Sequence, residues 1–192
     1  MEILKYPHPF LKRKCKPVKS IDDKLVARVA EMFETMYRAR GVGLAAPQVG
    51  WDARLFVINA SGNKCDEVVF VNPVIVDTVG TVNEEEGCLS VPGVNAIVPR
   101  AERVRVRAFD LKGSSFELEA DGLLAIALQH ENDHIDGKLF ISKLTRAAKQ
   151  AVADKLKELE DEFEPKPPTR IQNSEFRIEN EDAESRSGHS EF

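Results

Sequence analysis

Apolar residues recur at steps of three and four in the segment after the N-terminal region, a spacing that puts them on one face of a helix. The residues of this stripe are Leu25, Val29, Met32, Phe33 and Met36. Ser20, followed three residues later by Asp23, resembles a capping box and predicts where the helix begins. Gly41 predicts where it ends. We therefore expect an N-terminal helix with one face against a core.

Residues 51–120 contain short runs rich in β-branched and aromatic residues, which is typical of strands. The runs RLFVINA, EVVFVNPVIV and TVNE come first, and Pro73 predicts an edge strand or a bulge. The run VRVRAFD alternates with a period of two, which places Arg103, Arg105 and Arg107 on one face. We interpret that face as solvated, with a basic binding patch as the alternative. A hairpin across LKGSS to the run FELEA is expected next.

A second helix is expected after Asp121, where the run LLAIALQHENDHI begins, and Gly137 predicts its end. Its first half is apolar all round, which normally marks a buried helix. A long, charged, amphipathic helix is expected over residues 142–164, and the polar segment 165–192 predicts a disordered tail. The predicted fold class is α+β. Antiparallel β-sheets pack around one buried helix, with an N-terminal helix and a long C-terminal helix, in one domain of residues 1–164.

The composition is that of a globular protein: 192 residues, 42% hydrophobic and 31% charged, with a net charge of −5. Acidic residues outnumber basic ones two to one from Asp154 onward, so the rest of the chain is close to neutral. We therefore expect no binding to DNA. The N-terminal segment has no apolar signal-peptide region, and the longest apolar run, residues 123–128, is too short to cross a bilayer. We expect neither secretion nor membrane insertion.

The three cysteines, Cys15, Cys65 and Cys88, do not make a disulfide framework, and we expect reduced thiols in the cytoplasm. The default interpretation of a lone cysteine is a small buried hydrophobic residue. We apply it to Cys15 and Cys65. Cys88 differs because it lies in the run EEEGCLSVPG, where a glycine permits close approach of the backbone.

The sharpest chemical pattern is His130-Glu131-Asn132-Asp133-His134, within the predicted buried helix. Residues i and i+4 share one helix face, so both imidazoles can reach a single ion. Glu131 lies about 100° around the helix from His130, where it can reach a water at the ion without being a ligand. A helix whose polar end simply emerges into solvent is the alternative. The pattern favours a metal site.

Two histidines leave such a site incomplete, because a catalytic zinc-type ion usually has three protein ligands. The thiolate of Cys88 is one candidate for the third ligand, suited to zinc or ferrous iron. Glu158, in the charged helix after the motif, is the other candidate and would give a His/His/Glu site. The residues alone leave both open.

Three segments in order, GVGLAAPQVG, EGCLSVP and QHENDHIDG, resemble the signature segments of the peptide deformylase family. The resemblance covers roughly residues 1–160. It implies that Cys88, His130 and His134 hold one divalent metal ion, with Fe²⁺ in the cell and Zn²⁺, Ni²⁺ or Co²⁺ in the isolated protein. The implied reaction is hydrolysis of the N-formyl group of formyl-methionyl nascent polypeptides, with release of formate, in the bacterial cytoplasm.

The resemblance also implies a role for each site residue. Glu131 would carry the proton between water and the leaving amine, while the Gln48 side chain and the Leu89 backbone N–H would stabilise the oxyanion. The remaining residues would bind substrate. They are Val42, Gly43, Glu86, Gly87, Leu123 and Ile126.

Four further expectations concern residues around the motifs. Arg100 is expected to pair with Asp133 behind the ligands. Asn95 stands where some bacterial relatives carry an arginine that can contact the substrate peptide. The resemblance therefore does not imply a peptide contact at this position beyond the first substrate residues. His8 and His189 are not expected to bind metal. The last helix resembles one that can associate transiently with the ribosome, although the acidic residues there argue against strong RNA contact.

Two other functions share parts of this pattern. A metalloprotease of another lineage would share the HExxH segment but cleave internal peptide bonds. A non-catalytic relative would hold a purely structural metal, which more often has a fourth protein ligand.

Overall fold

The computed structural model describes residues 1–164, so the predicted disordered tail, 165–192, lies outside the described residues. The described chain forms one five-stranded antiparallel sheet with the strand order β1-β2-β3-β6-β7, and a separate hairpin of β4 and β5. The strands are β1 (Gly43–Ala45), β2 (Leu55–Ile58), β3 (Val68–Val79), β4 (Val82–Cys88), β5 (Val91–Arg100), β6 (Arg103–Phe109) and β7 (Ser115–Asp121).

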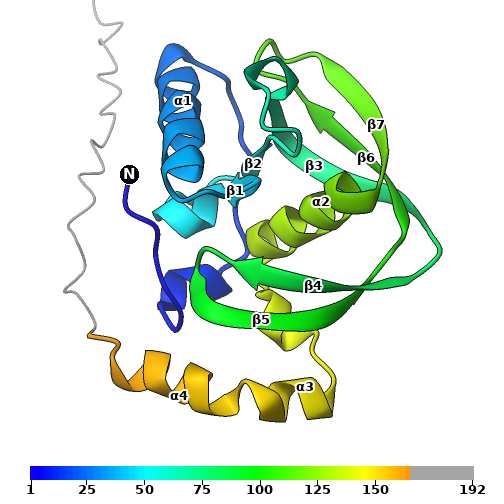
Figure 1. Ribbon diagram of the computed structural model, residues 1–192. Helices are drawn as coiled ribbons and strands as arrows, with labels where there is room; N and C mark the ends of the chain where they lie inside the picture. The colour runs from blue at the N-terminus through cyan, green and yellow to red at the C-terminus, as the bar shows by residue number, and fades with distance from the viewer. Residues whose placement is uncertain (165–192) are drawn as a thin grey trace, which may run out of the picture.

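Helix α2 lies between the large sheet and the β4–β5 hairpin, while α1 packs against the opposite face at the β1–β2 end of the sheet (Figure 1). The α-helices are α1 (Asp23–Arg38), α2 (Gly122–Ile135), α3 (Arg146–Ala151) and α4 (Ala153–Asp161). Short 3₁₀ helices are η1 (Pro9–Lys12), η2 (Ala46–Val49), η3 (Lys64–Asp66) and η4 (Phe140–Ser142). The predicted α+β class, with antiparallel sheets around the helix that carries the HExxH segment, is confirmed. No helix within the described part is both long and apolar enough to span a bilayer.

Strand β2 shows why the sheet has a helix on each face. All four of its residues are buried, and successive side chains of a strand point to opposite faces. Leu55 and Val57 pack in the core beneath α1, whereas Phe56 and Ile58 pack in the core beneath α2. A continuous apolar strand is therefore what this position in the fold requires.

Helix α1 buries all five residues of the predicted apolar stripe. The predicted capping box is wrong, because Asp22 and not Ser20 is the N-cap residue. The Asp22 carboxylate accepts a hydrogen bond from Leu25 N at 2.8 Å, which satisfies an amide that the helix leaves free.

Strand β3 tolerates Pro73 through a bulge. Its pairing with β6 shifts in register between Val71 and Val74, while β3 itself lies inside the sheet between β2 and β6. Of the two alternatives, the bulge is therefore right and the edge strand is wrong. The predicted β6–β7 hairpin is also present, with Phe109 opposite Ser115.

The first turn of α2 is less buried than its apolar sequence predicts. Leu123 is 53% exposed, whereas Leu128 one and a half turns later is fully buried. The helix begins beyond the cover of the hairpin, so one side of this turn faces a cavity rather than a core. Gly137 ends the helix as expected, at φ 73°, where a Cβ atom would lie 2.7 Å from the Lys12 carbonyl oxygen.

The predicted long C-terminal helix is two short helices. Val152 separates α3 from α4 with φ −103° and ψ 2°, and its branched side chain is a poor helix former. Thr145 caps α3 by accepting from Ala148 N at 3.2 Å. Helix α4 buries Leu159 in the core that includes β5, so this part of the chain closes the fold beneath the hairpin.

Candidate metal centre and active site

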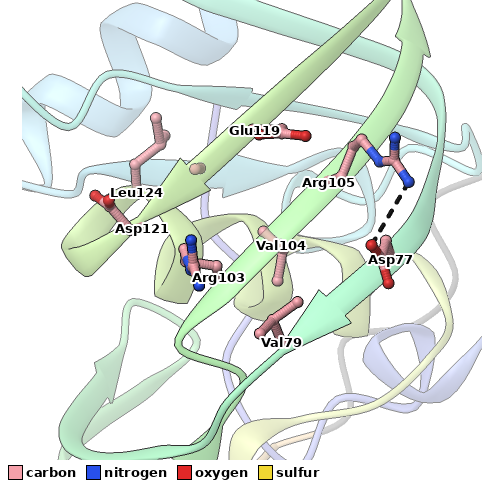
Figure 2. A pocket seen from close by; sticks show the side chains of 9 residues that line it. Asp77, Val79, Arg103, Val104, Arg105, Glu119, Asp121 and Leu124 are labelled. Atoms are coloured by element: carbon pink, nitrogen blue, oxygen red, sulfur yellow. Dashed lines mark ion pairs between the residues drawn. The ribbon is translucent and has the colours of Figure 1, made fainter.

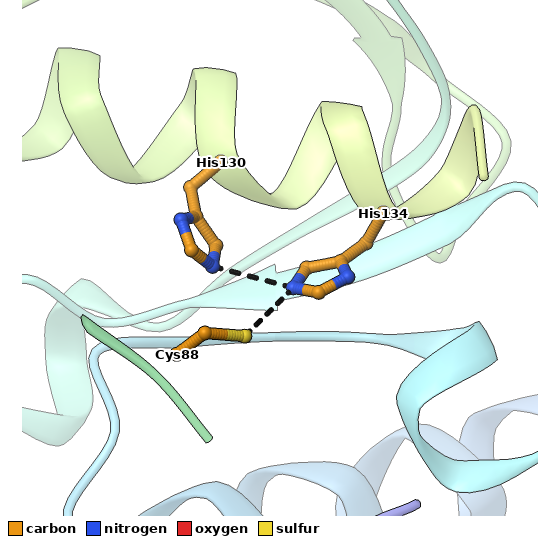
Figure 3. Close-up of side chains that lie close together, drawn as sticks. All are labelled: Cys88, His130 and His134. Carbon is orange, nitrogen blue, oxygen red and sulfur yellow. Dashed lines mark hydrogen bonds between the residues drawn. The ribbon is translucent and has the colours of Figure 1, made fainter. Parts of the chain in front are cut away.

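Helix α2 and the end of β4 bring three metal-ligating side chains together (Figure 3). His130 and His134 lie one turn apart on α2, with their Nε2 atoms 3.2 Å from each other. Cys88 Sγ lies 3.3 Å from His134 Nε2, and the three ligand atoms all fall within 4.8 Å of one another. Two imidazole nitrogens and a sulfur therefore converge on one point.

This cluster fits a divalent ion. With metal–nitrogen bonds of about 2.0–2.1 Å and a metal–sulfur bond of about 2.3 Å, the edges of a tetrahedral shell are about 3.3–3.6 Å. The observed separations of 3.2 and 3.3 Å are close to these edges. Glu158, the other candidate ligand, is outside the cluster because its side chain is half exposed and pairs with Lys155 at 2.7 Å.

A buried ionic network orients the ligand His130. Glu86 Oε2 accepts a hydrogen bond from His130 Nδ1 at 2.8 Å, which leaves Nε2 directed at the cluster. Arg100 donates to both carboxylate oxygens of Glu86, at 2.5 and 2.9 Å, and to Asp133 Oδ2 at 2.6 Å. The expected Arg100–Asp133 contact is thus present. The link from Arg100 through Glu86 to His130 was not predicted, because it depends on how β4 faces α2.

Two carboxyl groups of the site have shifted pKa values in opposite directions. Burial favours a raised pKa for Glu86, but its hydrogen bonds to Arg100 and His130 outweigh burial and hold the pKa at about 2. Burial raises the pKa of Glu131 to about 7, and its Oε2 atom has no hydrogen-bond partner among the described residues. Glu86 is therefore a fixed charge, whereas Glu131 is a buried carboxyl group with a free oxygen.

A cavity of about 390 Å³ opens beside the cluster. Every site residue that the family resemblance assigned lines it, except His134, which is buried behind the wall. The lining residues are Arg40, Gly41, Val42, Gly43, Gln48, Glu85, Glu86, Gly87, Cys88, Leu89, Leu123, Ile126, Ala127, His130 and Glu131. Val42 and Leu123, exposed by 39% and 53%, lie at its apolar part. Arg40, Gly41, Glu85 and Ala127 were not assigned to the site from the sequence.

The Gln48 side chain is buried and held at both ends. Its Oε1 accepts from Ala45 N at 2.8 Å, and its Nε2 donates to Ser90 Oγ at 3.2 Å and lies 3.8 Å from Cys88 Sγ. Ser90, which is fully buried, was missed by the sequence analysis. Its place directly after Cys88 and Leu89, in the turn between β4 and β5, is the signal that could have found it.

The two glycines assigned to substrate binding have different neighbours. A Cβ atom at Gly43 would lie 2.5 Å from Glu131 Oε1, so glycine is required there to make room for the carboxyl group. A Cβ atom at Gly87 would lie 2.6 Å from Asn95 Oδ1, which is the end of a flexible side chain. Asn95 thus covers Gly87 across the β4–β5 pair.

A second hollow of about 500 Å³ lies over β3, β6 and β7, away from the cluster (Figure 2). It is lined by the arginine face of β6, and Arg105 pairs with Asp77 at 3.5 Å. Arg103 and Arg105 lie opposite Asp121 and Glu119 on β7, and Arg107 donates to Glu117 at 2.8 Å. The interleaved charges agree with a solvated strand face rather than with a basic patch.

The other singled-out side chains lie elsewhere in the fold. Cys15 is buried, and burial raises the pKa of its thiol to about 11. Cys65 is exposed, which contradicts the expectation of a buried residue, because it belongs to the short surface helix η3. His8 packs edge-on against Phe163, outside the cluster. His189 lies outside the described residues.

Comparison with known proteins gives a consistent result. The family model described as polypeptide deformylase matches residues 1–150. A peptide deformylase of Chromobacterium violaceum is 49% identical over 160 residues, covering 83% of this chain and 96% of that protein. One of Neisseria gonorrhoeae is 48% identical over 157 residues, covering 82% and 94%.

The similarity extends to the three-dimensional structure. The crystal structure of a peptide deformylase from Legionella pneumophila superposes with a TM-score of 0.79 at 46% identity, covering 86% of this chain and 98% of that one. The chain therefore belongs to the polypeptide deformylase family, metal-dependent hydrolases that remove the N-formyl group from nascent polypeptides.

Proposed function

We propose that this chain hydrolyses the N-formyl group of formyl-methionyl nascent polypeptides at a single divalent ion held by Cys88, His130 and His134. The ion is Fe²⁺ in the cell, and Zn²⁺, Ni²⁺ or Co²⁺ can replace it in the isolated protein. One observation carries the proposal: a sulfur and two imidazole nitrogens lie within 4.8 Å of one another, at a cavity shared with the buried Glu131 carboxyl group, whose Oε2 has no partner among the described residues.

Glu131 is the proton carrier. A divalent ion held by Cys88, His130 and His134 would supply Lewis acidity and would lower the pKa of a water near it. Glu131 lines the cavity, and its Oε2 makes no hydrogen bond with the described residues, so this carboxyl group would accept the proton of the attacking water. The same oxygen then gives the proton to the amine nitrogen as it leaves the formyl carbon.

Gln48 and Leu89 stabilise the negative charge that develops on the formyl oxygen. Gln48 Nε2 lies 3.8 Å from Cys88 Sγ, so its N–H groups reach the space beside the sulfur. Leu89 follows Cys88 directly in the chain and lines the same cavity, so its N–H is the second candidate donor. Because the contacts of Gln48 with Ala45 and Ser90 fix its amide before substrate arrives, the donor needs no reorganisation during the reaction.

The remaining cavity residues bind the substrate. Val42, Leu123 and Ile126 provide an apolar wall for the methionine side chain. Gly43 and Gly87 allow the substrate backbone to approach the main chain closely. Glu86 lines the cavity and also holds His130, so it contributes to both the pocket and the metal centre.

The catalytic domain of this proposal comprises residues 1–164. Formylated nascent chains are made in the bacterial cytoplasm, and we place the activity there. Transient association with the ribosome through the last helix would bring the enzyme to its substrate. Activity and ribosome pelleting that are both unchanged after truncation at Lys149 would contradict a role for α4 in that association.

Release of formate from formyl-Met-Ala-Ser by protein purified without oxygen tests the proposal. We expect turnover by the wild type and a loss of at least about 100-fold in Glu131→Gln with metal content unchanged, because the amide cannot carry the proton. The matched control is Glu158→Gln, an exposed residue outside the cavity, which keeps full activity.

Two outcomes would overturn this assignment. Cleavage of internal bonds in unformylated peptides, without formate release, would make the chain a peptidase. A tightly held metal with no turnover in the wild type would make the metal structural.

A further inference from the structure

The N-terminal segment Leu4–Tyr6 crosses the turn that carries the metal-ligand cysteine. Leu4 N donates to the Gln48 carbonyl oxygen at 2.7 Å, and Tyr6 N donates to the Ser90 carbonyl oxygen at 2.7 Å. Between them, Lys5 Nζ donates to the Leu89 carbonyl oxygen at 2.5 Å. Backbone hydrogen bonds thus hold the segment in place before and after Lys5. This fixes the Lys5 side chain, whose ammonium group contacts the turn.

The position of Lys5 matters because of the peptide group that it contacts. The Leu89 carbonyl and the Ser90 N–H belong to the same peptide group. The Ser90 N–H donates to Cys88 Sγ, with a nitrogen–sulfur distance of 3.4 Å. A continuous path therefore runs from the Lys5 ammonium through one peptide group to the sulfur.

Hydrogen bonds in such a chain strengthen one another. A cationic donor on the carbonyl oxygen makes the N–H of the same peptide group a better donor, because the peptide group is polarised along its length. A stronger N–H···S bond withdraws electron density from the sulfur. Groups around a metal ligand tune the metal in this way.

We propose that Lys5 is a positioning residue of the metal centre, which acts through the Leu89–Ser90 peptide group to reduce electron donation from Cys88 Sγ. This inference rests on the proposed role of Cys88 as a metal ligand. A less donating sulfur leaves more positive charge at the ion, which favours hydrolysis. Lys5 touches neither substrate nor the ligand atoms and is not a catalytic residue.

The test is the sulfur-to-metal charge-transfer absorption band of the Co²⁺-loaded protein. In Lys5→Met, the sulfur gains electron density, so the band moves to longer wavelength. We also expect kcat for formate release to fall by about ten-fold at unchanged KM. Lys5→Arg keeps a cationic donor and returns the band toward its wild-type position.

The matched control is Lys12→Met in the same N-terminal region. The Lys12 side chain makes no hydrogen bond or ion pair with the described residues, and this variant keeps the wild-type band. An equal shift in Lys12→Met would overturn the inference, because the effect would then be one of overall charge. Equal thermal unfolding midpoints of the wild type and Lys5→Met exclude a loss of fold as the cause.

The inference and the proposed function can fail separately. If the wild type releases formate and shows the band, but Lys5→Met shows no shift, the role of Lys5 is wrong and the metal centre stands. If the wild type shows no sulfur-to-cobalt band, Cys88 is not a ligand, and both are overturned.

Discussion

The two hollows of this molecule are similar in size but differ in how their polar groups are satisfied. The hollow over β3, β6 and β7, of about 500 Å³, is the larger, and its Asp77–Arg105 pair is about half exposed. The cavity beside α2, of about 390 Å³, places a sulfur and two imidazole nitrogens within 4.8 Å of one another. In the outer hollow, opposite charges pair with each other and remain in contact with water. In the inner cavity, three metal-ligating atoms converge on one point.

This difference shows that neither size nor charge marks the functional site. One atom of the outer hollow, Arg105 Nε, is buried without a partner among the described residues, but the same guanidinium group reaches Asp77 and solvent. In the inner cavity, Glu131 Oε2 is buried without a partner among the described residues, in a side chain that has little access to water. Unsatisfied polar atoms at a convergent ligand set are costly unless they serve a ligand or a reaction.

Removal of the Cys88 sulfur has the largest expected effect, because it takes away the metal binding that distinguishes the inner cavity from the outer hollow. In Cys88→Ala we expect loss of bound metal and of formate release, because two imidazoles alone hold the ion poorly. Metal analysis after purification without oxygen measures this. In Glu158→Ala both properties remain at the wild-type level. Loss of metal from Glu158→Ala but not from Cys88→Ala would reverse the ligand assignment.

Substitution of Arg100, which pairs with the cavity residue Glu86, and of Arg105 in the outer hollow compares a buried ionic network with a half-exposed ion pair. Arg100→Met leaves Glu86 and Asp133 buried without their main partner, so we expect a loss of about 3–5 kcal/mol in the free energy of unfolding. Arg105→Met removes a half-exposed pair and costs about 0–1 kcal/mol. Denaturant unfolding measures both, and equal losses would contradict the distinction between a buried network and a solvated face.

Substitution of Gly43 tests how tightly the inner cavity holds its carboxyl group. The Cβ of Gly43→Ala would lie 2.5 Å from Glu131 Oε1, so the carboxyl group must move. We expect kcat to fall by about 100-fold, the scale of a misplacement of about 1 Å, with metal content unchanged. Steady-state formate release with metal analysis measures this, and an unchanged kcat would show that Glu131 has no fixed position.

The three thiols differ in their expected reactivity, and this is the smallest of the predicted effects. Cys65 is exposed and reacts with iodoacetamide before Cys15, which is buried with a pKa raised to about 11. Because the thiolate is the reactive form, labelling of Cys15 increases only as the pH rises toward 11. Cys88 is protected by the bound ion and becomes reactive after chelation. Mass spectrometry identifies the labelled residue, and labelling of Cys88 in the metal-loaded protein before Cys65 would contradict its role as a ligand.

The sequence predicts the local part of the site. The i, i+4 spacing places His130 and His134 on one helix face, and the structure has both on α2. Cys88 lies 42 residues before His130, so spacing alone could not bring them together; the ordered family segments did. The path from Arg100 through Glu86 to His130 and the Lys5 contact were missed, because each joins separate elements whose register only the fold sets.

The errors in element boundaries have local physical causes. Asp22 competes with Ser20 for the cap of α1, and its carboxylate has the better position for Leu25 N. The break at Val152 divides a segment whose apolar spacing alone predicts one helix. Leu123 has the residue type of a core position but lies beside a cavity, and hydrophobicity cannot distinguish a core from a pocket wall.

X-ray absorption at the zinc edge of the Zn²⁺-loaded protein tests the central claim most directly. One sulfur from Cys88, two nitrogens from His130 and His134 and one water oxygen predict a first shell with one scatterer at about 2.3 Å and three at about 2.0–2.1 Å. In Cys88→Ala the sulfur scatterer disappears. A wild-type shell of nitrogen and oxygen alone would contradict the account.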